Sequence, residues 1–144
     1  MRCARSRSEA VAGRTSEPHW LNRVVLDAIH FEQLREHGGL HGIRDEGALE
    51  SALARPRQKW WYERKADIVS LAAAYGFGIA SNHPYRDGNK RVAFLALVTF
   101  LGLNGYEFEA ADNDIVSEMF ALAAGQVSEG ELIQWIGWHS VRRR

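Results

Sequence analysis

Apolar residues recur every three or four positions through several stretches of the chain, which is the period of an α-helix with one buried face. The first stretch runs from Trp20 to about His37, where Gly38 and Gly39 follow. The pattern therefore predicts a first helix that the two glycines end. Its apolar positions are Leu21, Val24, Val25, Ala28, Ile29 and Leu34.

A short second helix is predicted to begin after Asp45, whose carboxylate can accept hydrogen bonds from the first free backbone N–H groups. It carries Leu49, Ala52 and Leu53 on one face. We expect it to end before Pro56, because the residue that precedes a proline disfavours helical geometry.

The segment 57–66 mixes aromatic and basic residues without a clear period, which predicts an exposed loop or flap. Trp60, Trp61 and Tyr62 are adjacent within it and fit two interpretations. They are either part of the core or a flap that contacts a target protein or an inhibitor, since aromatic residues often anchor interfaces.

Two strongly apolar stretches in the middle of the chain are predicted to form the central helices of the core. Asp67 opens the first, which continues to about Ala80. The second runs from about Asn89 to Asn104, and the Gly105 that follows is typical of a left-handed helix cap.

Two more helices are predicted in the last third of the chain. One starts at Asp112 or Asn113, and the other follows Ser128, which forms a capping-box pattern with Glu131. The segment 106–109 alternates for too few residues to found a sheet. The predicted fold is therefore all-α, a compact bundle of about six helices with at most a small hairpin flap.

Composition fits one globular domain. The chain has 144 residues, of which 46% are hydrophobic and 25% charged, and a chain of this size can bury a single core. Residues 1–18 are rich in Arg and Ser with little to bury, which predicts a disordered basic tail. The domain is expected to span 19–141, followed by a basic, solvated end at 142–144.

Charge and cysteine content restrict the partners and the compartment. Lys+Arg and Asp+Glu number 18 each, so no overall basic field exists to hold nucleic acid or a membrane surface, and neither is an expected direct partner. Cys3 is the only cysteine and cannot form an intramolecular disulfide, which favours a reducing compartment. With no stretch that is apolar enough to span a membrane and no secretory signal, we expect a cytoplasmic protein.

The stretch from His83 to Arg91, HPYRDGNKR, brings together a base, a carboxylate, a glycine and cations within nine residues. Gly88, Asn89 and Lys90 are expected at the start of a helix, where free N–H groups bind anions such as phosphate. Lys90 and Arg91 add positive charge, Asp87 is an oxygen ligand suited to magnesium, and His83 is a candidate general base. From the residue types alone, phosphate chemistry and a charged loop with a packed histidine both remain open.

Other polar residues of the chain carry weaker signals. Arg44 and Glu50 are interpreted as parts of a structural salt-bridge network. His19, His30 and His139 are isolated in the sequence and suggest no site.

The motif resembles the signature of the Fic family, HPFxx(D/E)GN followed by G or K and then R. The resemblance to its death-on-curing (Doc) branch extends from about Trp20 toward the C-terminal region through the segments AIHFEQLREHGGL, GIRDEGALESALARP and FLGLNGYEF. It implies that His83 is the catalytic base, that Asp87 binds magnesium, and that Gly88, Asn89, Lys90 and Arg91 hold the phosphates of ATP.

Two departures from AMP-transferring relatives point to a kinase. Lys90 stands where those relatives have a second glycine, and Phe94 where they have an arginine. The Doc branch shares the lysine and phosphorylates a threonine of elongation factor Tu, which arrests translation. The resemblance therefore implies a Mg²⁺- and ATP-dependent protein kinase toxin.

The resemblance also implies an antitoxin of the prevents-host-death type, and we hypothesise that an apolar groove between helices receives it. AMP or another nucleotidyl transfer to a protein hydroxyl, and a non-catalytic co-repressor that binds its antitoxin, are the alternatives.

Overall fold

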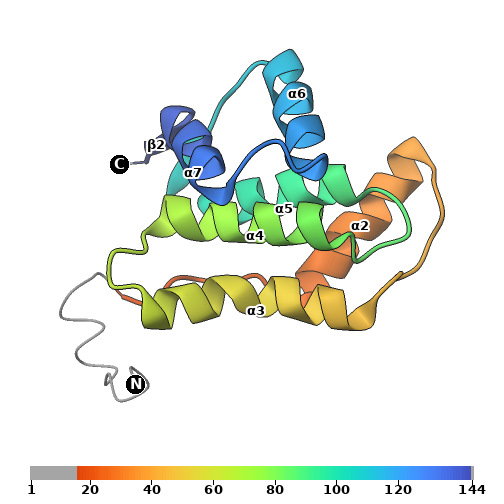
Figure 1. Ribbon diagram of the computed structural model, residues 1–144, viewed down its shortest axis with the longest axis horizontal. Helices are drawn as coiled ribbons and strands as arrows, with labels where there is room; N and C mark the ends of the chain where they lie inside the picture. The colour runs from red at the N-terminus through yellow and green to blue at the C-terminus, as the bar shows by residue number, and fades with distance from the viewer. Residues whose placement is uncertain (1–15, 144) are drawn as a thin grey trace.

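The computed structural model describes residues 16–143 and is almost entirely helical (Figure 1). The arginines and the cysteine of the predicted tail before residue 16, and Arg144, lie outside the described residues. In the described part of the chain, six helices and two three-residue strands follow one another, which confirms the predicted all-α class. They are α2 (Arg23–His37), α3 (Glu46–Tyr62), α4 (Ile68–Asn82), α5 (Asn89–Leu103), β1 (Tyr106–Phe108), α6 (Asp112–Ala123), α7 (Glu129–Trp138) and β2 (Ser140–Arg142).

Most helix starts lie where the capping residues of the sequence predict them. The side chains of Asn22, Asp45, Asp67 and Ser128 each accept a backbone N–H of the helix that follows, so each satisfies a donor that would have no partner inside the helix. The first helix begins a few residues later than predicted, because Asn22 caps it.

Two predictions are wrong in the region of α3: the short second helix that ends before Pro56, and the exposed loop that begins at residue 57. Pro56 lies inside α3, which continues to Tyr62. The buried positions Leu49, Ala52, Pro56 and Trp60 form one continuous helical stripe, and burial of this stripe outweighs the loss of one backbone hydrogen bond at the proline. Of the two interpretations of the aromatic cluster, core packing is correct for Trp60, which is 3% exposed, whereas Tyr62 is 54% exposed.

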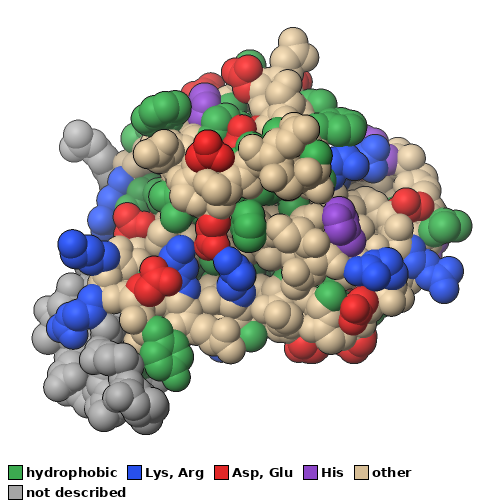
Figure 2. All heavy atoms as spheres, viewed as in Figure 1, with side chains coloured by type: hydrophobic (Ala, Val, Ile, Leu, Met, Phe, Trp, Pro, Cys, Tyr) green, Lys and Arg blue, Asp and Glu red, His purple; other side chains and the backbone are tan. Residues whose placement is uncertain are grey.

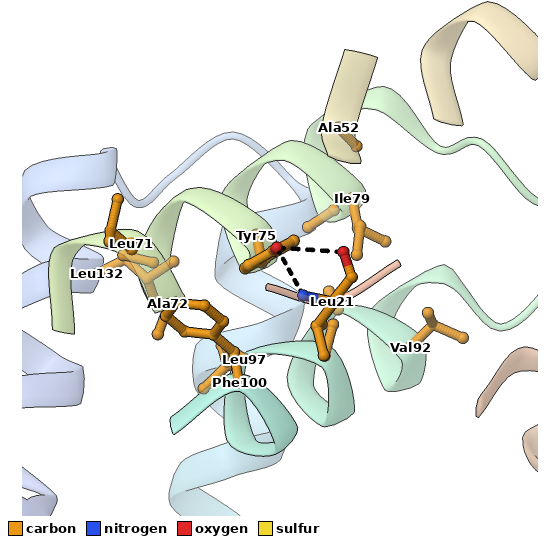
Figure 3. Packing of buried hydrophobic residues seen from close by; sticks show 14 of the residues in the cluster. Leu21, Ala52, Leu71, Ala72, Tyr75, Ile79, Val92, Leu97, Phe100 and Leu132 are labelled. Atoms are coloured by element: carbon orange, nitrogen blue, oxygen red, sulfur yellow. Dashed lines mark hydrogen bonds between the residues drawn. The ribbon is translucent and has the colours of Figure 1, made fainter. Parts of the chain in front are cut away.

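Helix α4 is the centre of the bundle, with α3, α5 and α7 packed around it (Figure 1). Gly76 allows α5 to come close, because a Cβ atom at this position would lie 2.8 Å from Leu97. Figure 3 shows Tyr75 in the middle of this packing, where its hydroxyl accepts from the backbone N–H of Leu21 at 3.0 Å. This bond ties the chain that precedes α2 to the core, and burial raises the pKa of Tyr75 to about 12.

The two short strands form an antiparallel pair in which Tyr106 lies opposite Arg142. β2 reaches Arg142, the first residue of the segment 142–144 that is predicted to be a solvated end. Arg142 and Arg143 are exposed, yet Arg143 donates to the backbone carbonyls of Tyr106 and Gly102 at 3.2 and 2.9 Å. The strand pair thus fastens the end of the domain to the end of α5. Among residues 16–143, no helix is long and apolar enough to cross a lipid bilayer.

Candidate active site

The motif residues form the connection between α4 and α5 and the first turn of α5. His83 ends α4 in a left-handed conformation, with φ 48° and ψ 57°, and no other described non-glycine residue has a positive φ. A left-handed conformation is unfavourable for a residue with a side chain and persists only where neighbours hold it. The side chain of His83 is exposed and can therefore reach a reacting group.

Arg44 holds the backbone of this connection. Its guanidinium donates from Nε to the carbonyl of His83 at 2.6 Å and from Nη2 to the carbonyl of Asn82 at 2.7 Å. The predicted salt-bridge network is therefore wrong for Arg44, which binds carbonyls at the end of α4. It is right for Glu50, which pairs with Arg23 at 2.9 Å.

Asn89 closes the loop from the other side. Its side-chain oxygen accepts the N–H of Tyr85 at 3.0 Å, and its side-chain nitrogen donates to the carbonyl of Tyr85 at 2.9 Å. The amide side chain is thus engaged within the loop. What Asn89 can offer to an anion is its backbone N–H in the first turn of α5.

Gly88 is the N-cap residue that precedes helix α5; it has φ 82° and gives the helix no side-chain cap. The first turn contains no acidic residue, while Lys90 and Arg91 bring two cations to it. Free N–H groups at the positive end of the helix dipole, beside two cations, form an anion-binding arrangement.

This helix start opens into a cleft of about 640 Å³ between α2, α5 and α6. Asp87 and the four predicted phosphate-binding residues all line it, whereas His83 does not belong to its lining. Apolar side chains of α5 and α6 also line it: Phe94, Leu95, Ile115, Val116, Met119 and Phe120. The cleft therefore combines charged side chains with an apolar lining.

The Asp87 carboxylate has one oxygen fixed by the protein. Oδ2 accepts the backbone N–H of Leu40 at 2.7 Å. Gly39 allows this approach, because a Cβ atom there would lie 3.2 Å from the Cβ atom of Asp87. No hydrogen bond to Oδ1 comes from the residues the structure describes.

A magnesium ion suits this single carboxylate. Within residues 16–143 no group of three or more metal-ligating side chains occurs. Magnesium in nucleotide sites commonly binds one or two carboxylates and completes its shell with phosphate oxygens and water. The donor set at Asp87 fits that pattern, and does not fit a metal site made of protein side chains alone.

Lys90 points along the wall of the cleft. Its Nζ lies 4.8 Å from the centre of the Phe120 ring, a cation–π contact. On the face that Figure 2 shows, basic, acidic and hydrophobic side chains are mixed and no sign of charge dominates. Because Lys+Arg and Asp+Glu number 18 each over the chain, the positive charge that Lys90 and Arg91 bring to the cleft is a local feature.

Sequence reasoning missed the contribution of His30, which it treated as isolated. His30 is buried on α2, and its Nε2 lies 3.0 Å from the carbonyl oxygen of Asp87. The signal was present, because His30 falls between Leu26 and Leu34 at four-residue spacing, and both leucines are buried. A histidine within a buried helix stripe needs a polar partner, although the sequence does not say which one.

Comparison with known proteins settles the family. The sequence pattern of the Fic/DOC family matches residues 20–101, more than half of the chain. The chain belongs to the Fic/DOC family. This confirms the family that the motif predicted, and the matched Fic/DOC region contains the whole loop and most of α5.

Two curated Fic/DOC relatives carry the Doc name. "Protein kinase doc" of Escherichia phage P1 is 33% identical over 82 residues, which are 57% of this chain and 65% of that protein. "Toxin Doc" of Mycolicibacterium smegmatis is 43% identical over 79 residues, 54% of this chain and 60% of that protein. The match thus spans less than two thirds of the length of either relative.

Proposed function

We propose that this Fic/DOC protein is the toxin of a toxin–antitoxin pair. It transfers the terminal phosphoryl group of Mg-ATP to a Thr or Ser hydroxyl of a translation factor, elongation factor Tu, and so arrests translation in the cytoplasm. The observation that carries the proposal is the uncapped, cationic start of α5, which lies beside the Asp87 carboxylate in one cleft. The names of the relatives, a protein kinase and a toxin, support it.

Each residue has a distinct task in this reaction. The bond from the terminal phosphorus to its bridging oxygen breaks, a bond to the hydroxyl oxygen forms, and His83 takes the hydroxyl proton. Gly88, Asn89, Lys90 and Arg91 hold the phosphate oxygens, and Asp87 holds the magnesium ion. When bound, magnesium neutralises the negative charge that the phosphate oxygens carry.

Two side chains in the cleft favour phosphoryl transfer over AMP transfer. Lys90 lies over Phe120 and occupies space that a glycine would leave open. Phe94 packs edge-on against Phe108, with ring centroids 5.5 Å apart, so that this position supplies apolar surface in place of a cation. A kinase that holds a terminal phosphate with Lys90 fits both features.

Inhibition by a separate protein also fits the described residues. Inhibitory helices of Fic relatives have a Ser or Thr four residues before a glutamate that Gly or Asn follows, whereas Gly42 and Gly125 stand at that position before Glu46 and Glu129, and both glutamates pair with cations. Neither is available as an internal inhibitor. We propose a prevents-host-death-type antitoxin whose helix covers an apolar groove, and co-purification with the neighbouring gene's product tests it.

The deciding experiment incubates the full chain with elongation factor Tu and Mg-ATP, then determines the intact mass of the factor. We expect a gain of one phosphate with the wild type and no gain with His83→Ala. His83→Asn is the matched control, because asparagine tolerates the left-handed conformation and lacks a basic group. A gain of one AMP would replace the kinase by a nucleotidyl transferase, and transfer by both variants would overturn the assignment of His83.

A further inference from the structure

His30 is a buried ionisable side chain of α2 whose contacts lead to the motif loop. His30 is 7% exposed. Among residues 16–143, Ser70 is the other residue of polar type that is buried. The Ser70 side chain belongs to the capping box at the start of α4, which explains its burial. The burial of His30 has no such local explanation, because its polar partner is 57 residues away.

The His30 ring is held in a defined orientation. It stacks on the ring of Tyr85 with centroids 3.8 Å apart and an interplanar angle of 15°. Its Nε2 lies 3.0 Å from the carbonyl oxygen of Asp87. Since a carbonyl oxygen can only accept, Nε2 carries the proton and donates it. Tyr85 is fixed in turn by Asp27, whose carboxylate accepts the hydroxyl at 3.0 Å.

This hydrogen bond fixes the peptide plane between Asp87 and Gly88. In a trans peptide the carbonyl and the following N–H point in opposite directions, and the described chain contains no cis peptide. A carbonyl of Asp87 turned toward His30 therefore turns the N–H of Gly88 away from His30. Gly88 lines the cleft and His30 does not.

The same bond holds the backbone that carries the Asp87 carboxylate. Leu40 fixes one carboxylate oxygen and His30 fixes the main-chain carbonyl of the same residue. Asp87 is thereby held at two points, from the segment after α2 and from α2 itself.

We propose that His30 is a positioning residue, which orients the Asp87–Gly88 peptide so that the Gly88 N–H faces phosphate and the Asp87 carboxylate faces the metal ion. The inference rests on the proposed phosphotransfer function for its ligand. His30 itself touches neither substrate nor reacting atoms. His30 contributes the N–H donor at Nε2, and the stacking of its ring on Tyr85 holds this donor within hydrogen-bond distance of the Asp87 carbonyl.

Two substitutions separate the donor from the ring. His30→Gln keeps an N–H donor at a comparable distance from the backbone and removes the ring. His30→Phe keeps a ring that can stack on Tyr85 and removes the donor. We expect the Kd for Mg-ATP, measured by calorimetry on the full chain, to rise about tenfold in His30→Phe and to stay within about threefold of wild type in His30→Gln, as the loss of one neutral hydrogen bond predicts.

Kinetics and melting temperatures distinguish positioning from a purely structural contribution. His30→Phe should raise KM for Mg-ATP and lower kcat, and His30→Gln should restore most of both values. Should both variants lose melting temperature and affinity to the same extent, or should the ring-retaining variant be the better of the two, the positioning proposal would be overturned.

A third measurement is independent of nucleotide. Amide hydrogen exchange of Leu40, whose N–H donates to Asp87, should accelerate in His30→Phe and remain at the wild-type rate in His30→Gln. If the wild type neither binds nor uses Mg-ATP, the proposed function fails, and the exchange rates still decide whether His30 positions Asp87. Equal exchange rates in the wild type and His30→Phe would contradict the positioning proposal whatever the nucleotide result.

Discussion

Helices α4 and α5 pack against each other at the centre of the fold, yet they begin in opposite ways. At the start of α4, Asp67 and Ser70 exchange two hydrogen bonds of 2.9 Å, so that side chains of the helix satisfy its own N–H groups. At the start of α5, Gly88 offers no side chain. The first start stabilises the domain, and the second leaves its donors available to a ligand.

Helix α6 shows that the absence of a cap is not sufficient for an anion site. Ala111 precedes α6 and gives it no side-chain cap either. Its first turn, however, carries Asp112 and Asp114, which already balance the positive end of the helix dipole. The start of α5 differs because its first turn carries Lys90 and Arg91 and no acidic residue.

Gly88→Ala alters the uncapped start of α5 and is expected to have the largest effect. A side chain at φ 82° costs about 1–2 kcal/mol, because left-handed backbone is unfavourable for L-residues with a Cβ atom. Displacing the N–H donors should also lower the transfer rate by about 100-fold, the typical effect of losing one preorganised donor. Single-turnover transfer and chemical denaturation measure the two effects, and a variant with wild-type transfer would show that the helix start does not bind phosphate.

Lys90→Met tests the cation at the same helix start. Methionine keeps an unbranched apolar stem against Phe120 and removes the charge. We expect KM for Mg-ATP to rise about 10-fold or more, since a hydrogen bond to a charged group contributes about 1.5–3 kcal/mol. The melting temperature should change little, and an unchanged KM would assign Lys90 to packing alone.

Asp67→Ala removes the side-chain cap at the start of α4. Loss of the N-cap should lower the free energy of unfolding by about 1 kcal/mol. The transfer rate of the folded protein should remain at the wild-type value, because Asp67 lies at the opposite end of α4 from His83. Urea denaturation and transfer kinetics together check this, and a slower transfer would mean that the two helix starts are coupled.

The smallest effect is expected from Glu118→Gln on α6. Burial, and then the charge of Glu131, raise the pKa of Glu118. Between its unfolded and folded pKa the folded state binds more protons, so the free energy of unfolding falls as pH rises through that window. The glutamine variant should therefore be slightly more stable than wild type at pH 7 and lose this advantage in acid. Denaturation curves at both pH values test the sign.

The sequence predicted the helices where local signals were sufficient and failed where distant contacts decide. Capping residues and apolar periodicity placed α4 to α7 within a few residues. Pro56 was misinterpreted because a local rule ends a helix there, whereas the buried stripe through Trp60 continues it. Only packing against the rest of the core favours that continuation, and a local rule does not contain it.

The candidate site likewise contains residues that the sequence motif identified and residues whose contacts come from distant parts of the chain. The motif placed Asp87 and the residues of the α5 start together because they are adjacent in sequence, and the structure brings them into one cleft. Arg44 and His30 come from other helices or loops, and both act on backbone carbonyls. Every residue has a backbone carbonyl, so residue types do not reveal which carbonyl accepts a hydrogen bond. The sequence therefore shows Arg44 and His30 as donors but does not show their acceptors.

The pairing of β1 with β2 also has a consequence for the order of folding. Tyr106 and Arg142 meet only after the intervening chain, which includes α6 and α7, has returned to the end of α5. Contacts this far apart in sequence form slowly, because the chain between them must be restricted first. We expect the α4–α5 pair to assemble before the chain from α6 to β2 is fastened to it, so that a newly made chain has part of its core before it has a complete binding site.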